Sequence, residues 1–171
     1  MKSGQNFGLL YTLLIVCQIL ICNYFQFSPY AMISILPVMT LCIPLNVGTI
    51  RCMFIAFISA LSVDWLAEGI IGLNAASLLP VALLRKPIIR VFFGEDLITR
   101  QDNFSVNKYG FAKVSVAMLS VTLLYIAIYI ILDGAGTKDL LFNLTRGAIS
   151  LVASYLVSLI VINTLTPDDR K

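Results

Sequence analysis

The chain has 171 residues, of which 59% are hydrophobic and 12% are charged, and its net charge is +3. Soluble domains carry roughly 25% charged residues, so this composition excludes a soluble protein and leaves no polar interval long enough for a soluble core. Histidine is absent, which removes the most frequent metal ligand and the usual base at neutral pH. We therefore expect an all-α integral membrane protein, with residues 1–171 forming a single membrane domain that needs no cofactor or metal and binds no nucleic acid.

The first apolar run covers residues 7–27. A helix of about 21 residues spans roughly 30 Å at 1.5 Å per residue, which is enough to cross a bilayer. No small-residue cleavage site follows the run, so we expect a retained helix and not a signal peptide. The four cysteines all lie in apolar stretches without a Cys-x-x-Cys pair and are expected to be small buried hydrophobic residues.

Three further segments precede the first basic cluster. Residues 30–45 contain Pro37 and Pro44, so we expect a short, kinked helix there. Residues 49–66 predict a third helix, and residues 70–84, interrupted by Pro80, predict a fourth. At about 15 residues the fourth segment covers only some 22 Å, so it is either a short crossing or a re-entrant segment.

The distribution of cations favours a crossing. If six segments cross and the N-terminus is cytoplasmic, the following residues lie inside: Lys2, Arg51, Arg85, Lys86, Arg90, Arg100, Lys108, Lys113, Arg170 and Lys171. Only Lys138 and Arg146 then lie outside, in agreement with the positive-inside rule. A re-entrant fourth segment would reverse this for the cations from Arg85 to Lys113. We therefore expect six transmembrane helices, with both termini in the cytoplasm.

The last three segments complete the predicted order. Residues 85–110 form a basic cytoplasmic loop whose apolar residues at helical spacing indicate either a segment on the anionic leaflet or a solvated loop. Residues 111–132 predict the fifth helix and residues 140–165 the sixth.

Small and polar residues repeat four apart in several of these helices. The repeats are Ala56, Ala60 and Asp64; Gly72, Ala76 and Pro80; and Gly147, Ser150, Ser154 and Ser158. Such faces let helices approach closely and allow hydroxyl groups to bond across the gap. They predict packing within the chain, or docking of another membrane protein.

Asp64 and Arg146 are the ionisable residues inside the outer part of the apolar runs. A carboxylate near hydrocarbon costs roughly 2.5–3.5 kcal/mol at a helix centre and less near the rim. Their similar depth leads to the hypothesis of a buried Asp64–Arg146 pair. The alternative is that each side chain extends separately to the membrane surface.

Motifs for catalysis are missing from the sequence. It contains no phosphate-binding loop, no Gly-x-Ser-x-Gly, no His-Glu-x-x-His and no acidic pair on one membrane helix that would hold Mg²⁺. Asp133 and Asp139 in a glycine-containing loop are a weak exception. We therefore do not expect an enzyme.

The third and fourth predicted helices with their connecting turn, residues 49–90, would form a helical hairpin. In it, Ala60-Leu-Ser-Val-Asp64 is followed eight residues later by Gly72-Leu-Asn74-Ala-Ala76 and then by the basic exit at Arg85. This order of features resembles that of the rod-shape-determining MreD family. The family pattern is a glycine, three apolar residues, an aspartate, a short turn and then Gly-Leu-His/Asn-Ala. This chain departs from it at Ala60, which stands at the glycine position, and Asn74 is the permitted alternative at the polar position. Size, six hydrophobic segments and the basic loop also fit.

The resemblance implies a non-catalytic scaffold of the bacterial cell-elongation machinery in the cytoplasmic membrane. It implies binding to the single-span protein MreC, indirect association with MreB, RodA and a class B penicillin-binding transpeptidase, and a fold like the S-components of energy-coupling-factor transporters. The hairpin and small-residue faces would then be packing or partner surfaces: Ala56, Ala60, Asp64, Gly72, Asn74, Ala76 and Arg146.

Two other functions compete with the scaffold. A transporter subunit could bind a small ligand near the outer surface, with Asp64, Asn74 and Arg146 lining the site. A lipid-modifying enzyme is the third interpretation, and it lacks the residues for catalysis.

Overall fold

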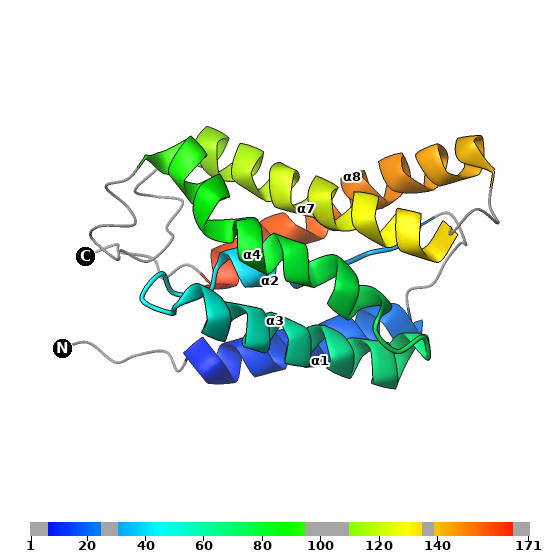
Figure 1. Ribbon diagram of the computed structural model, residues 1–171, viewed down its shortest axis with the longest axis horizontal. Helices are drawn as coiled ribbons and strands as arrows, with labels where there is room; N and C mark the ends of the chain where they lie inside the picture. Colours follow the sequence, from blue (N-terminus) through cyan, green and yellow to red (C-terminus); the bar gives the residue numbers. More distant parts are fainter. Residues whose placement is uncertain (1–6, 25–30, 95–109, 135–138, 166–171) are drawn as a thin grey trace.

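The computed structural model describes residues 7–24, 31–94, 110–134 and 139–165, and within these residues all regular structure is helical (Figure 1). The helices are α1 (Phe7–Tyr24), α2 (Leu36–Leu41), α3 (Thr49–Val63), α4 (Leu73–Phe93), α7 (Phe111–Gly134) and α8 (Leu140–Leu165), and α3 continues directly into a π-helix, η1 (Asp64–Glu68).

Four stretches are long and apolar enough to cross a membrane: α1, α3 together with η1, α7, and α8 up to Ile162. This agrees with the prediction of an all-α integral membrane protein. The helix α4 has 21 residues, about 31 Å at 1.5 Å per residue, but its second half carries Arg85, Lys86 and Arg90. It is therefore long enough to cross and less apolar than the other four.

The predicted kinked helix over residues 30–45 is wrong. Residues 31–35 are not helical, and only Leu36–Leu41 form a helix, α2, with Pro37 in its first turn. Proline fits the first turn because the amide it lacks would have no partner there. Pro44 follows the end of α2, where it opposes continuation of the helix. We call residues 31–35 the strap.

The helix α4 also differs from its prediction. It begins at Leu73, not at residue 70, and continues through Pro80 and Pro87 to Phe93, where Gly94 ends it with a positive φ of 80°. The first part of the predicted basic loop 85–110 is therefore helical, and its helical spacing of apolar residues belongs to α4. Residues 95–109 of that loop lie outside the described residues.

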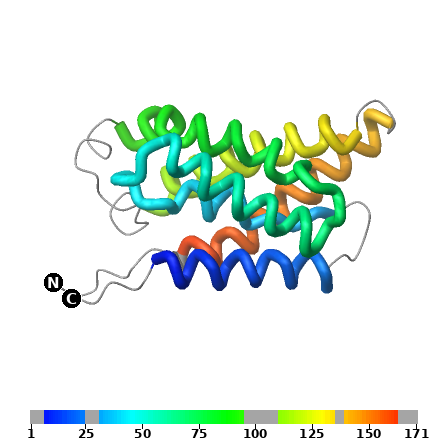
Figure 2. Tube along the Cα trace, turned by 60° about the horizontal axis from the view of Figure 1, so that its bottom comes forward, coloured from blue at the N-terminus to red at the C-terminus, as the bar shows by residue number. Residues whose placement is uncertain are grey.

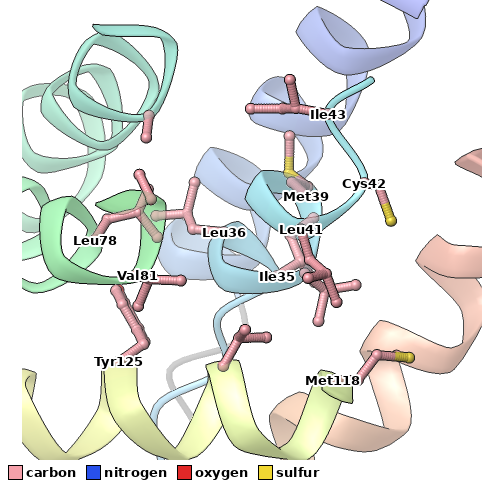
Figure 3. Packing of buried hydrophobic residues seen from close by; sticks show 14 of the residues in the cluster. Ile35, Leu36, Met39, Leu41, Cys42, Ile43, Leu78, Val81, Met118 and Tyr125 are labelled. Atoms are coloured by element: carbon pink, nitrogen blue, oxygen red, sulfur yellow. The ribbon is translucent and has the colours of Figure 1, made fainter. Parts of the chain in front are cut away.

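The core is built around α2, because all six of its residues are buried. Figure 3 shows Leu36 against Leu78 and Val81 of α4, with Met118 and Tyr125 of α7 on another side. A helix that is apolar all round needs neighbours on every side. Here α3, α4, α7 and α8 supply them.

The longer helices run side by side around α2 (Figures 1 and 2). The helix α4 packs between α3 and α7, and α7 in turn packs against α8. The helices α7 and α8 approach closely at Gly147, where a Cβ would lie 3.1 Å from Cδ1 of Ile130. The helix α1 contacts η1, α2, α3 and α8, and most of its surface faces outward.

Charged side chains of the described residues are separated between the two ends of this bundle. One end, which we call the cationic end, is where α3 and α7 begin and α4 ends. It contains Arg51, Arg85, Lys86, Arg90 and Lys113. At the opposite end lie Asp64, Glu68, Asp133 and Asp139, together with Arg146, which we call the acidic end.

Candidate functional site

Asp64 lies at the junction of α3 and α4 and is completely buried. It closes the last turn of α3 and begins η1, and Gly69, with φ of 71°, ends η1. Gly72, with φ of 99°, then begins α4. Positive φ values favour glycine because a Cβ would clash with the backbone. The two glycines thereby turn the start of α4 back toward the Asp64 carboxylate.

The Asp64 carboxylate accepts four hydrogen bonds from the start of α4. One oxygen, Oδ2, accepts from the backbone amides of Gly72 at 2.9 Å and Ala75 at 3.3 Å. The other, Oδ1, accepts from the backbone amide of Asn74 at 3.0 Å and from its side-chain Nδ2 at 2.8 Å. Free amides and a positive partial charge at a helix N-terminus favour an anion. The first turn of α4 therefore compensates the burial of this charge.

Asn74 connects this cap to α7. It is 1% exposed, and its Oδ1 accepts a hydrogen bond from the hydroxyl of Tyr125, which is also buried. One turn further along α7, the hydroxyl of Tyr129 donates to Oε2 of Glu68 at 2.9 Å. Two tyrosines of α7 thus bind both halves of the α3–η1–α4 hairpin.

Arg146 does not pair with Asp64, so that hypothesis is wrong. Its guanidinium forms an ion pair with Asp133 at the end of α7 and lies 5.9 Å from the centre of the Tyr129 ring, within the range of a cation–π contact. Equal depth predicted the wrong partner because Asp64 is already saturated by donors that follow it closely in the sequence.

The small residues of the predicted faces divide into two groups. Ala56 and Ala60 are fully buried in α3, where they belong to the packing of the chain. Ala76 is exposed and Gly72 half-buried, and the alanine of α4 that faces the core is Ala75. Of the small residues predicted on α3 and at the start of α4, Gly72 and Ala76 are therefore the ones that reach the surface, where a partner could contact them.

The serine face of α8 holds the strap. Ser150 Oγ accepts from the backbone amide of Met32 at 2.9 Å. Ser154 Oγ accepts from that of Ser34 at 3.0 Å and donates to the carbonyl of Met32 at 3.3 Å. Backbone groups in a membrane need partners within the protein, because hydrocarbon offers none. The two serines supply these partners to the strap, because its backbone is not helical and cannot pair within itself.

Gln18 of α1 binds the strap from its other side, a role that the sequence analysis missed. Its Oε1 accepts from the amide of Ile35 at 2.8 Å and its Nε2 donates to the carbonyl of Ile33 at 3.0 Å. The signal available in the sequence was a lone glutamine inside an apolar run. Polar side chains at such positions usually bond to another part of the protein.

Arg85 was predicted in the basic loop but is 1% exposed. Its Nε donates to the carbonyl of Leu41, the last residue of α2, at 3.2 Å, and its Nη1 lies 3.7 Å from Sγ of Cys52. A cation at a helix C-terminus is favourable. The signal available in the sequence was periodic: the buried positions Leu78, Val81 and Ala82 of α4 continue at helical spacing to Arg85.

No protein-family model, curated protein or solved structure matches the chain.

Proposed function

We propose that the chain is a non-catalytic membrane scaffold of the bacterial cell-elongation complex, of the MreD type, that binds MreC and through it works beside MreB, RodA and a class B penicillin-binding transpeptidase. The observation that carries the proposal is the Asp64–Asn74 cap, because the residues that resemble the family motif act together. Asp64 accepts all four hydrogen bonds, Gly72 provides the positive φ, and Asn74 joins the cap to α7.

The same contacts weigh against the competing role in ligand transport. Asp64, Asn74 and Arg146, the groups that would line a ligand site, are bonded to other parts of the chain. A ligand would have to replace bonds that stabilise the hairpin and the α7–α8 pair. A scaffold needs no such exchange, since its partners contact outward-facing surfaces.

We further propose six membrane crossings, with the cationic end and both termini in the cytoplasm and an arrangement like that of transporter S-components. Four crossings are the apolar stretches described above, the fifth is α4, and the sixth is the strap with α2. The separation of cations from acids along the bundle supports this orientation. A reporter fused after Lys108 is expected to be cytoplasmic, and an external location would refute the orientation.

Co-purification with MreC tests the scaffold. We expect the chain to retain MreC through mild detergent extraction, and depletion of the chain to round rod-shaped cells. Ala76→Trp places a large side chain on the exposed edge of α4 and is expected to weaken retention. Ala127→Trp, at an exposed alanine of α7, is the matched control and should retain MreC. Failure of the chain to retain MreC, an unchanged cell shape after depletion, or ligand-dependent thermal stabilisation of the isolated chain would refute the proposal.

A further inference from the structure

Arg85 is a buried cation whose hydrogen bonds are incomplete. Its Nε and Nη1 contact the Leu41 carbonyl and the Cys52 thiol, which are both neutral, whereas its Nη2 is enclosed and has no partner among the described residues. Buried guanidinium groups ordinarily bond through all three nitrogens, because an unpaired buried donor costs free energy. The Arg146 guanidinium at the acidic end, by contrast, has a carboxylate partner.

Among the described residues, charge around Arg85 is also unbalanced. The acids of the described residues lie at the acidic end, and Asn74, beside Asp64, precedes Arg85 by eleven residues, about 16 Å along α4. The C-terminus of α2 offers only about half a negative charge. Lys86 follows Arg85 in the chain and lies within electrostatic range of the same Cys52 thiol. Arg51, next to Cys52 on α3, is exposed. At the cationic end, α3 and α4 thus bring together three cations, Arg51, Arg85 and Lys86.

We propose that the cationic end of α3 and α4 forms a binding site for the phosphate group of an anionic phospholipid. Exposed Arg51 and half-buried Lys86 would hold the headgroup from the membrane side, and the free Nη2 of Arg85 would be the deepest donor to a phosphate oxygen. Guanidinium groups suit phosphate because their planar N–H groups match its oxygens. Cations at the end of membrane helices meet the lipid headgroups. The inference is independent of the scaffold function.

The enclosure of Nη2 gives the proposal a specific requirement. Side chains around Arg85 must turn aside for the phosphate to reach it, so the lipid should bind slowly and stabilise the folded protein once bound. Free phosphate lacks acyl chains that pack on the apolar outer faces of α3 and α4 and is expected to bind far more weakly.

Thermal unfolding of the whole chain in a neutral detergent tests the site. We add phosphatidylglycerol, phosphatidylcholine or inorganic phosphate in separate titrations. Phosphatidylglycerol is expected to raise the midpoint saturably, and the other two are not. Removal of the Arg85 donor by Arg85→Gln should weaken the apparent affinity for phosphatidylglycerol about tenfold, the equivalent of one charge-assisted hydrogen bond.

Two further variants keep the test decisive if Arg85→Gln fails to fold. Arg85→Lys retains the charge but not the planar fork and should also reduce the lipid-dependent shift, as should the double variant Arg51→Gln/Lys86→Gln. Lys113→Gln removes an exposed cation at the same end, on α7, and should leave the shift unchanged. An unchanged shift in Arg85→Lys, or an equal shift with phosphatidylcholine or inorganic phosphate, would overturn the proposal.

Discussion

The strongest test of the described geometry is the substitution Asp64→Asn, which keeps the shape of the side chain and removes its charge. An amide has one acceptor oxygen, so one carboxylate oxygen is replaced by an NH₂ group that faces donors. Two donors then lose their acceptor, either the backbone amides of Gly72 and Ala75 or both amides of Asn74. Each buried donor left unpaired costs about 1–3 kcal/mol. We therefore expect the free energy of unfolding to fall by about 2–6 kcal/mol.

The free energy can be measured by steric trapping of the unfolded chain in bicelles. Asp139→Asn is the matched control, because Asp139 is exposed, directly precedes α8 and accepts from the amide of Leu140 at 2.8 Å. Asparagine is as good as aspartate at such a position, so the control should change stability by less than about 0.5 kcal/mol. A difference of less than about 1 kcal/mol between the two variants would show that Asp64 does not cap α4 as described.

Three further predictions concern the other contacts. Gly72→Ala should cost about 1–2 kcal/mol because its φ of 99° is unfavourable for a residue with a Cβ. Gly48, the N-cap of α3, has φ of −60° and open space around a Cβ, so Gly48→Ala should lose only the N-cap preference for glycine, less than about 1 kcal/mol; equal losses of unfolding free energy in the two variants would contradict this. Ser154→Ala should lower the free energy of unfolding by about 1–3 kcal/mol, because the backbone amide of Ser34 in the strap loses its acceptor. Ser120→Ala, which only loses a bond to its own helix, should change it little. A loss below about 1 kcal/mol for Ser154→Ala in the same denaturation assay would be evidence that Ser154 does not hold the strap. In double-mutant cycles, Arg146→Gln should couple to Asp133→Asn by about 0.6–1.7 kcal/mol and should not couple to Asp64→Asn. The reverse result would support the hypothesis of an Asp64–Arg146 pair.

The long apolar helices were predictable because their signal is local. Hydrocarbon requires each crossing segment to satisfy its own backbone, so a run of about 20 apolar residues indicates a helix. Residues 140–165 were predicted with the bounds that α8 has. The helix α7 ends two residues beyond its prediction, at Gly134.

The strap was not predictable by the same reasoning. Its backbone is satisfied by Ser150 and Ser154, which are 118–122 residues away in the sequence, and by Gln18 on the other side. A window of the sequence contains none of these partners. An apolar run with two prolines therefore suggested a kinked helix, although the remote side chains allow an extended segment.

The error at the start of the basic loop has a different origin. Three cations within six residues, Arg85 to Arg90, suggested a solvated loop or a segment on the anionic leaflet, because charge usually opposes burial. The free energy of that burial depends on where α2 ends, since the Leu41 carbonyl is directed to Arg85. That position became known only from the tertiary arrangement. The candidate residues Asp64 and Asn74 were found from the motif, but their hydrogen-bond partners also became known only from the tertiary arrangement.

The two buried charges of the hairpin share one physical solution. Asp64 is held by the N-terminus of α4, and Arg85 is held through its Nε by the C-terminus of α2, so among the described residues each bonds to a helix end and not to an oppositely charged side chain. A helix end is fixed by the backbone and cannot rotate away as a side chain can, and so it holds the charge in one geometry. This leaves the hairpin a rigid element whose polar groups at the acidic end are directed inward. Apart from Arg51 near its start, the outward surface of α3 and η1 is then mainly apolar, with Ile50, Phe54, Ile58 and Trp65 largely exposed. Such a surface can contact lipid or the membrane helix of a partner without disturbing the core.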